Sequence, residues 1–193
     1  MKPDDSIRRQ ELLSSAARLF RDVGYPRATV RDIAKAVGIQ SGSIFYYFKT
    51  KEDILVDVME AAMQTFVGAA QRALREASTP ETKLRELFVG HLKALHGSSD
   101  ETAVVLSEWR NLSAKSRRKI VKLRDQVDSM WDEALRDASA AGLVRGDLRL
   151  LRLAMLGSLN WSLQWYAPKG GLSIEELADR FLEFFLTPAK ARG

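Results

Sequence analysis

The sequence predicts an all-α protein of about nine helices, and the positions of its prolines support that prediction. Helical periodicity of the apolar residues stops at each of the five prolines, which are Pro3, Pro26, Pro80, Pro168 and Pro188. No Asn-Gly or Asp-Gly pair lies between alternating apolar runs, where a β-hairpin would need one. At 193 residues the chain can bury a sizeable core, in one domain or in two small ones.

The N-terminal end is predicted to hold one long helix and two short ones. The long helix runs from about Asp5 to Val23 and ends at Gly24. The first short helix covers residues 29–37, because four apolar residues recur there with helical spacing. These residues are Val30, Ile33, Ala34 and Val37. Gly38 then ends the helix, and the second short helix is expected from about Gly42 to Phe48.

The two short helices and the glycine-containing turn between them are the pattern of a helix-turn-helix unit. In the second helix Ile44 and Phe48 can point inward, which leaves Ser43, Tyr46 and Tyr47 facing out. Small hydroxyls and phenols are groups that touch phosphates and base edges. The alternative is that the two tyrosines are half-buried packing residues, and this segment alone leaves both readings open.

The charge distribution favours contact with nucleic acid. Residues 1–51 hold ten Lys/Arg and five Asp/Glu, whereas residues 52–193 hold twenty of each. The whole formal charge of +5 therefore lies on the helix-turn-helix segment, and a basic end on a neutral body is typical of a nucleic-acid binder. A membrane surface would also attract this charge, but the segment lacks the long basic amphipathic helix that such binding uses.

Six further helices follow from apolar periodicity and from residues that suit helix starts. Thr50 with Asp53, Thr79 with Pro80, Ser98 with Glu101, and Ser173 with Glu176 are the predicted starts. The helices are expected at about 51–77, 80–96, 98–112, 114–141, 148–166 and 174–186. The domain boundary is placed at residue 50, with a helix-turn-helix domain over 1–50 and a ligand-binding and dimerisation domain over 51–193.

The last two predicted helices indicate a homodimer. The helix at 148–166 is apolar nearly all round, and such a helix is buried on several sides, one of which a partner subunit can cover. Together the two helices resemble half of a four-helix bundle completed by a symmetry mate. The interface is predicted to contain Leu148, Met155, Leu159, Tyr166, Leu177, Phe181 and Phe184. The alternative is that both helices are central in the core of a monomer.

The aromatic residues of the second half suggest a pocket for a hydrophobic small molecule. Such pockets are mostly apolar and carry a few polar groups that orient the ligand. The predicted lining is Phe66, Phe88, Leu92, Trp109, Trp131, Gly157, Asn160, Trp161 and Gln164, with Asn160 and Gln164 as its polar anchors. For any single tryptophan the ordinary alternative is that it fills the core.

Other kinds of site find little support. His91 and His96 lie five residues apart with no third ligand nearby, so no metal is expected, and the chain has no cysteine. The basic run at 115–124 is best explained as a solvated helix face. No catalytic motif and no cofactor motif is present, so an enzyme is not expected. No run is apolar enough to span a membrane, and the N-terminus does not resemble a secretory signal, so a cytoplasmic location is expected.

The stretch ARLFRDVGYPRATVRDIAKAVGIQSGSIFYYFKTKEDIL, residues 17–55, resembles the N-terminal module of the TetR family of bacterial repressors. The resemblance implies an all-helical homodimer that binds a palindromic DNA operator and responds to an inducer. By position, Thr29 and Arg31 would contact DNA, and Lys51 would hold a phosphate. The recognition surface would be formed by Ser41, Gly42, Ser43, Tyr46 and Tyr47. The family usually has tyrosine where this chain has Phe45, which cannot donate to a phosphate but can contact a thymine methyl.

The segment NWSLQWYAPKGGLSIEELADRFLEFFL, residues 160–186, is similar to members that control fatty-acid or steroid degradation and respond to acyl-CoA thioesters. Some of those members hold the CoA phosphates with basic residues, but the neighbouring positions here are Gly157 and Gln164. Arg149 and Arg152 lie a turn or more away, so a free hydrophobic effector is equally open. The expected function is a repressor released from its operator by a hydrophobic molecule. The alternative is a DNA-binding dimer with no effector.

Overall fold

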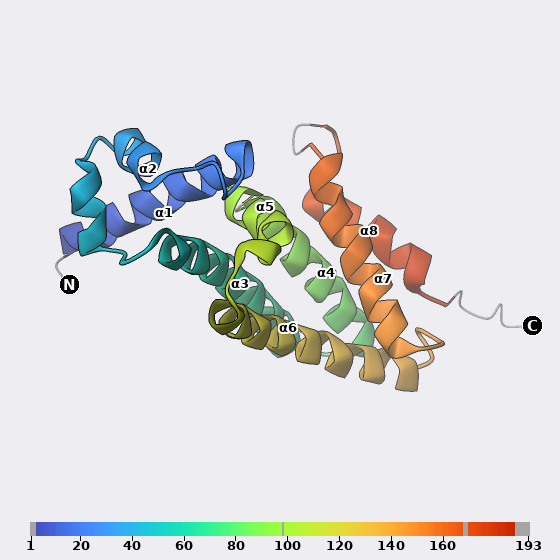
Figure 1. Ribbon diagram of the computed structural model, residues 1–193. Helices are drawn as coiled ribbons and strands as arrows, with labels where there is room; N and C mark the ends of the chain where they lie inside the picture. The colour runs from blue at the N-terminus through green and yellow to red at the C-terminus, as the bar shows by residue number, and fades with distance from the viewer. Residues whose placement is uncertain (1–2, 98, 168–169, 188–193) are drawn as a thin grey trace, which may run out of the picture. The chain divides into compact units, whose positions relative to one another are not determined.

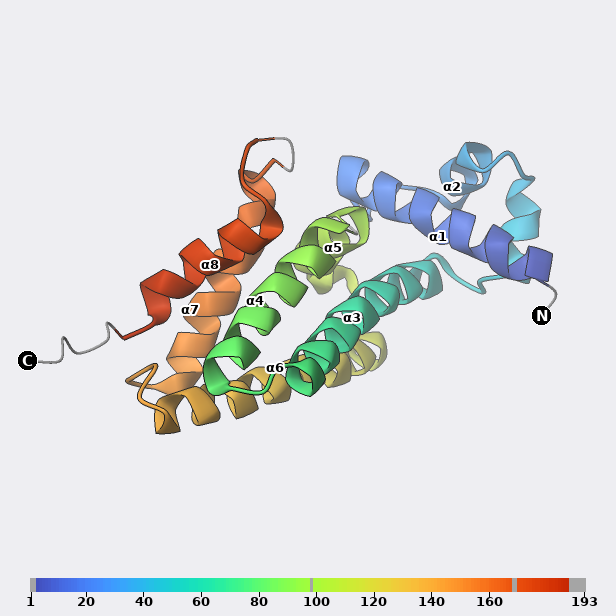
Figure 2. The same ribbon diagram turned by 180° about the vertical axis from the view of Figure 1, so that it is seen from behind.

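The computed structural model describes residues 3–97, 99–167 and 170–187, and these residues are all-α as predicted. Figures 1 and 2 show the chain from opposite sides. The α-helices are α1 (Pro3–Val23), α2 (Val30–Ala36), α3 (Lys51–Glu76), α4 (Pro80–Gly97), α5 (Ser99–Ser107), α6 (Ala114–Ala140), α7 (Leu148–Trp161) and α8 (Ile174–Phe185). Three short 3-10 helices are η1 (Ser41–Tyr46), η2 (Trp109–Asn111) and η3 (Ser162–Gln164). None of the described helices combines the length and apolarity that crossing a bilayer requires.

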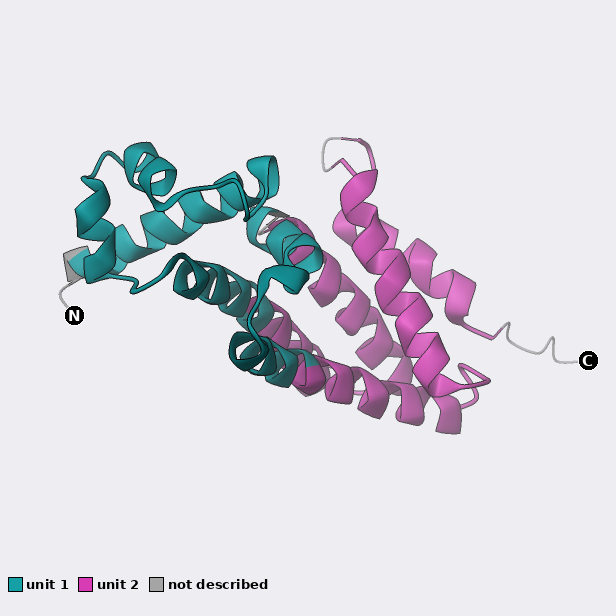
Figure 3. Ribbon diagram, in the orientation of Figure 1, with its two compact units in different colours: residues 1–64, 98–124 teal, residues 65–97, 125–193 magenta. Residues whose placement is uncertain are grey.

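The chain divides into two compact units (Figure 3). Unit 1 comprises residues 1–64 and 98–124, and unit 2 comprises residues 65–97 and 125–193. The long helices α3 and α6 each contribute to both units. This division follows compactness. The domain boundary predicted at residue 50 concerns which part binds DNA, and it stays a prediction.

In unit 1, α1 packs against α2 and α5, and α2 packs against η1. The core between them is apolar and fully covered: Leu12, Phe20, Ile33 and Ile44 have no exposed surface. Gly24 and Gly38 end α1 and α2 with φ angles of 82° and 71°, a left-handed conformation that favours glycine. The chain can therefore turn sharply after α1 and again between α2 and η1.

In unit 2, α4 lies beside α7 and α8 (Figures 1 and 2). Arg85 on α4 binds Asp179 on α8 through two parallel contacts, with Nε–Oδ1 and Nη2–Oδ2 distances of 2.7 and 3.0 Å. Arg152 on α7 pairs with Asp128 and Asp132 on α6, at 2.5 and 2.8 Å. These ion pairs fix α7 and α8 against the other helices of the unit.

Most predicted helix bounds are confirmed, with three differences. The second helix of the helix-turn-helix is a 3-10 helix over Ser41–Tyr46 and not a helix over 42–48. The element predicted at 98–112 is divided into α5 and η2, and the helix predicted at 148–166 ends at Trp161 with one 3-10 turn after it. Such tightening is common at helix ends. The predicted start at Ser98 and the predicted stops at Pro168 and Pro188 lie outside the described residues.

Candidate nucleic-acid interface and effector site

The 3-10 geometry of η1 decides which side chains it presents. With three residues per turn, residues three apart lie on the same side of the helix. Ile44 is fully buried, so its side is the inner one. Phe45 and Tyr46 are turned outward and are 57% and 75% exposed. The alternative of half-buried packing tyrosines therefore fits Tyr47, which is half-buried, and not Tyr46.

The two tyrosines of η1 support each other. The Tyr47 side chain is half-buried, and its ring meets the Tyr46 ring at 5.0 Å with an interplanar angle of 88°. This edge-to-face arrangement is a favourable one for aromatic rings. Tyr47 thus contacts the ring of Tyr46, while Tyr46 stays exposed. Ser41, Gly42 and Ser43 are also exposed, so the predicted recognition residues form one accessible surface.

At the start of α2, Thr29 and Arg31 are exposed as well. The Thr29 hydroxyl caps the helix: it accepts from the Asp32 amide at 3.2 Å and donates to the Asp32 carboxylate at 2.6 Å. These hydrogen bonds from Thr29 lower the pKa of Asp32 below its usual value. Arg31 forms no ion pair with any described residue, so its guanidinium is available to a ligand in solution.

Lys51 is engaged inside unit 1. Its ammonium donates to the backbone carbonyls of Tyr25 and Ala28 at 2.8 and 2.9 Å, and lies 4.2 Å from the centre of the Tyr25 ring. Two of its three donors therefore hold the loop between α1 and α2, which positions the start of α2. The phosphate contact implied by the family resemblance remains a prediction, and Lys49, which is exposed, is a second candidate for it.

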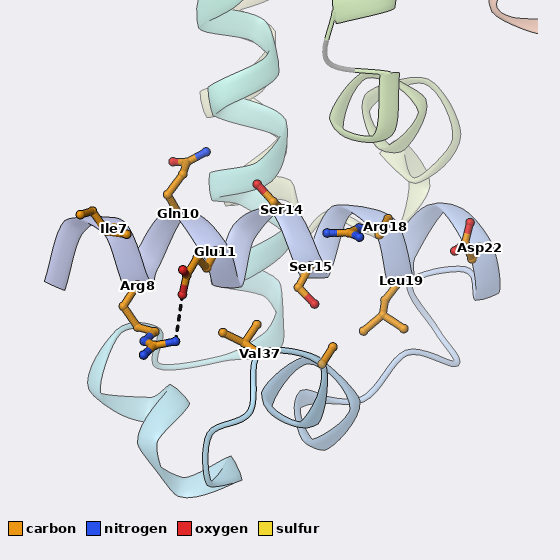
Figure 4. A pocket seen from close by; sticks show the side chains of 11 residues that line it. Ile7, Arg8, Gln10, Glu11, Ser14, Ser15, Arg18, Leu19, Asp22 and Val37 are labelled. Carbon is orange, nitrogen blue, oxygen red and sulfur yellow. Dashed lines mark hydrogen bonds and ion pairs between the residues drawn. The ribbon is translucent and has the colours of Figure 1, made fainter. Parts of the chain in front are cut away.

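Unit 1 also has a cavity of about 780 Å³ between α1 and the end of α2 (Figure 4). Arg8 and Glu11 form an ion pair of 2.9 Å at its edge, and Arg18 and Asp22 line it further along α1. The lining mixes both charges with apolar side chains, of which Val37 is one. This mixture specifies no single class of ligand.

The predicted pocket residues Phe66, Phe88, Leu92 and Trp131 are all buried in the core of unit 2. The rings of Phe88 and Trp131 lie 5.4 Å apart. These four residues come from α3, α4 and α6. The structure thus places four of the six large apolar residues of the predicted lining in the core of unit 2.

The sequence did not predict that His91 would be the polar centre of this cluster. Its ring lies 4.8 Å from Phe66 and 6.1 Å from Trp131, and its Nε2 is 2.9 Å from Oδ1 of Asn160 on α7. Burial lowers the pKa of His91 to about 4, although the hydrogen bond with Asn160 opposes this shift. The imidazole is therefore neutral near pH 7. The sequence did carry one signal for this position: His91 follows Phe88 by three residues, which places both on one face of α4.

A second histidine on α4 makes a similar link. The Nε2 atom of His96 lies 2.9 Å from the hydroxyl of Ser162, which is fully buried, and the His96 ring is 4.8 Å from that of Tyr166. Burial lowers the pKa of His96 too. Two neutral imidazoles thus connect α4 with α7 and η3.

Four residues assigned to the pocket lie elsewhere. Trp109 belongs to unit 1, where its ring lies 5.6 and 5.9 Å from the guanidinium carbons of Arg117 and Arg124. Gly157, Trp161 and Gln164 are exposed on α7 and η3, and Trp161 is 65% exposed. Gly157 and Trp161 lie on the side of α7 that is turned away from the buried Met155 and Leu159.

The predicted dimer residues are divided in a similar way. Met155, Leu159 and Leu177 are buried by their own chain, which leaves them no surface for a partner. Leu148 and Tyr166 are half-buried, and the Tyr166 hydroxyl donates to the Leu172 carbonyl at 2.8 Å. Phe181 is half-buried, whereas Phe184 is 82% exposed.

The exposed apolar surface of unit 2 lies on the other face of α7 and continues onto the segment after it. Its members are Leu150, Leu153, Trp161 and Trp165, and we call them, with Phe184, the outer apolar face. Leu150, Leu153 and Trp161 recur with helical spacing, so they share one side of α7. The dimer assignment of Met155 and Leu159 is thus at odds with their full burial within the chain, whereas the pocket assignment of Gly157 and Trp161 stays a prediction on an exposed side of α7.

Comparison with known proteins agrees with this architecture over the whole chain. Residues 12–58 match the family described as bacterial regulatory proteins, tetR family, and residues 77–188 match the tetracyclin repressor-like C-terminal domain. The HTH-type transcriptional repressor KstR2 of Mycolicibacterium smegmatis is 34% identical over 193 residues, covering 96% of this chain and 94% of its own.

Two solved structures extend the comparison. Superantigen PfiT has a TM-score of 0.80 and 40% identity, covering 98% of this chain and 100% of its own. AibR, in complex with isovaleryl coenzyme A and operator DNA, has a TM-score of 0.84 and 26% identity, covering 94% of this chain and 100% of its own.

Proposed function

The chain belongs to the TetR family of bacterial regulatory proteins, and on that premise we propose that it is a transcriptional repressor that leaves its operator when a hydrophobic small molecule binds. The observation that carries the DNA-binding part is the outward side of η1. There Phe45 and Tyr46 stand exposed on a segment that holds the entire net charge of +5. Exposed aromatic residues on a basic helix-turn-helix fit a surface that DNA covers. Operator DNA of a bacterium lies in the cytoplasm, so we expect the protein there.

The protein is proposed to bind as a homodimer through the outer apolar face. Large exposed apolar side chains of this kind mark interaction sites, and Leu153, Trp161 and Phe184 are among them. A two-fold dimer presents two copies of η1, which suits a palindromic operator with half-sites about one helical turn, ~34–36 Å, apart or somewhat further.

The effector is proposed to enter unit 2 next to His91 and Asn160. Their hydrogen bond is the polar feature among the Phe66, Phe88 and Trp131 rings, and an entering carbonyl can take the place of the Asn160 oxygen as the acceptor for His91. An acyl-CoA thioester carries such a carbonyl beside an apolar chain, and AibR binds isovaleryl coenzyme A. Arg152 is already paired with two aspartates, so it is not free to hold the CoA phosphates.

Binding of the effector would act on α7 directly. Asn160 is hydrogen-bonded to His91 at the proposed effector site, and the next residue, Trp161, belongs to the outer apolar face. A shift of α7 therefore changes how two subunits are placed, and with them the distance between the two η1 helices. To release DNA the effector must prefer the shifted state, and a hundredfold preference corresponds to about 2.7 kcal/mol of coupling.

The test begins with selection of bound fragments from genomic DNA, followed by operator binding measured by fluorescence anisotropy. Tyr46→Ala should weaken binding at least tenfold, whereas Leu106→Ala, at another exposed side chain of unit 1, should not. Absence of sequence-specific binding by the wild-type protein would contradict the DNA-binding assignment.

Isovaleryl-CoA, palmitoyl-CoA, palmitate and CoA alone are then titrated against the operator complex. Release by the thioesters, with loss of that release in His91→Phe, supports the effector site. Release by palmitate but not by the thioesters would identify a free acid as the effector. If none of the four compounds releases DNA, the result favours the alternative, a DNA-binding dimer without an effector of this kind.

A further inference from the structure

A stripe of polar side chains, four of them charged, runs along α1 and lines the cavity of unit 1 (Figure 4). Its members are spaced alternately three and four residues apart, so they share one side of the helix. They are Arg8, Glu11, Ser15, Arg18 and Asp22, and we call them the α1 stripe. The four charged residues are exposed, whereas Ser15 is buried. The middle of the stripe is therefore free of long side chains.

The α1 stripe carries two positive and two negative charges, which disfavours the phosphate backbone of DNA as its partner. Glu11 and Asp22 are exposed carboxylates, and a phosphate would be repelled by them. Arg18 is open to a partner, because it forms no ion pair with any described residue. Arg8 and Glu11 pair with each other at 2.9 Å, yet their side chains remain 44% and 50% exposed. The stripe thus suits a partner that carries charges of both signs.

The order of these charges matches a second copy of the same helix. From the N-terminus the stripe reads positive, negative, positive, negative. Read backwards it has the opposite sign at every position. Two copies of α1 that pack antiparallel, with their centres at Ser15, therefore bring Arg8 near Asp22 of the second copy and Glu11 near its Arg18. Two-fold symmetry makes each of these pairings occur twice. A parallel arrangement would instead place like charges side by side.

On these grounds we infer that the α1 stripe binds the α1 stripe of a second copy of the chain in an antiparallel arrangement. Ile7, which is 60% exposed and also lines the cavity, is covered at each end of this contact. The contact belongs to unit 1, whereas the outer apolar face belongs to unit 2, so it joins one proposed homodimer to another. Ion pairs at a surface are individually weak, and the contact therefore acts between copies that are already close, such as dimers on neighbouring DNA sites.

The test uses Ser14→Cys, because the chain has no cysteine of its own and residue 14 lies at the centre of the antiparallel contact. Four exposed ion pairs together correspond to about tenfold in association. In a glutathione redox buffer, disulfide-linked pairs should form about tenfold faster in Ser14→Cys than in Leu106→Cys, a change at an exposed position of α5. Adding Glu11→Arg should remove this advantage, because like charges then face each other. Adding both Glu11→Arg and Arg18→Glu should restore it, because that pair forms again with its signs exchanged.

The direction of the Glu11→Arg effect separates the contact from local thiol chemistry. Without the contact, a new positive charge near the introduced thiol would favour the thiolate and speed disulfide formation. Glu76→Arg makes the same change of net charge at an exposed position of unit 2, and it should leave the rate in Ser14→Cys unchanged. Linkage no faster in Ser14→Cys than in Leu106→Cys, or no rescue by Arg18→Glu, would overturn the inference. Either result leaves the proposed function standing, because this assay contains no DNA.

Discussion

Replacing His91 with glutamine should remove a large part of the acid sensitivity of unit 2. His91 has a pKa of about 4 in the folded protein, against an ordinary value of 6.5, because it is buried. The unfolded chain therefore binds a proton at a pH where the folded chain does not. The free energy of unfolding must fall as the pH drops through 6.5, and the loss levels off below about pH 4. The full difference is about 3 kcal/mol, of which about 2 kcal/mol is lost between pH 7 and pH 5.

The measurement is urea unfolding of the wild type and of His91→Gln at pH 7, 6 and 5, followed by tryptophan fluorescence. Glutamine can still bond to Asn160 but loses the ring contacts with Phe66 and Trp131, so about 1–2 kcal/mol should be lost at pH 7. Between pH 7 and 5 the variant should then lose about 2 kcal/mol less than the wild type. His96→Gln is the control, because His96 is less buried and should have a smaller effect. An identical pH dependence in His91→Gln and wild type would refute a buried neutral His91.

Three further predictions follow from the contacts of single side chains. Lys51→Met should lower the free energy of unfolding by about 2 kcal/mol, since two hydrogen bonds and a ring contact are lost. The salt slope of operator binding should fall by about one ion in whichever of Lys51→Met and Lys49→Met removes the phosphate contact, and an unchanged slope in Lys51→Met would assign that contact to Lys49. The double change Leu153→Asp and Trp161→Asp should give monomers in sedimentation velocity at micromolar concentration, and a persisting dimer would exclude the outer apolar face. Arg152→Met should cost about 2 kcal/mol in urea unfolding, because two aspartates of α6 are left without their cation.

Helix positions were predictable because the signals that fix them are local. Thr50 and Asp53 exchange hydrogen bonds at the start of α3, as their spacing predicts. Ser173 and Glu176 form the predicted capping box of α8. A cap involves residues three apart, so it can be recognised without knowing what the helix packs against. The 3-10 form of η1 was not predictable in this way, because a six-residue element lacks enough turns to separate a period of 3.0 from one of 3.6.

Contacts between distant segments were harder to predict. In the sequence, His91 has no polar partner at helical spacing. Its hydrogen bond with Asn160 joins residues that are 69 positions apart. Lys51 carries the charge that a phosphate contact needs, yet its nearest acceptors are the carbonyls of a loop 23 and 26 residues earlier. Residue type and spacing show what a side chain can bind, whereas the tertiary fold decides which partner within the chain reaches it first.

Apolar periodicity cannot distinguish the face of α7 that packs in its own chain from a face that covers a second subunit. Met155 and Leu159 lie on one side and Leu153 and Trp161 on another, and all four are large and apolar. A helix that covers its own core and a helix that covers a second subunit require the same kind of side chain, because both remove apolar surface from water. The polar residues do not distinguish the two faces, because Asn160, which is hydrogen-bonded to His91 on α4, follows the exposed Leu153 by seven residues and lies on nearly the same side of α7. Burial decides the question: Met155 and Leu159 are fully covered by their own chain, so their side is the inner one, and the exposed Leu153 and Trp161 form the surface that a second copy of the chain can cover.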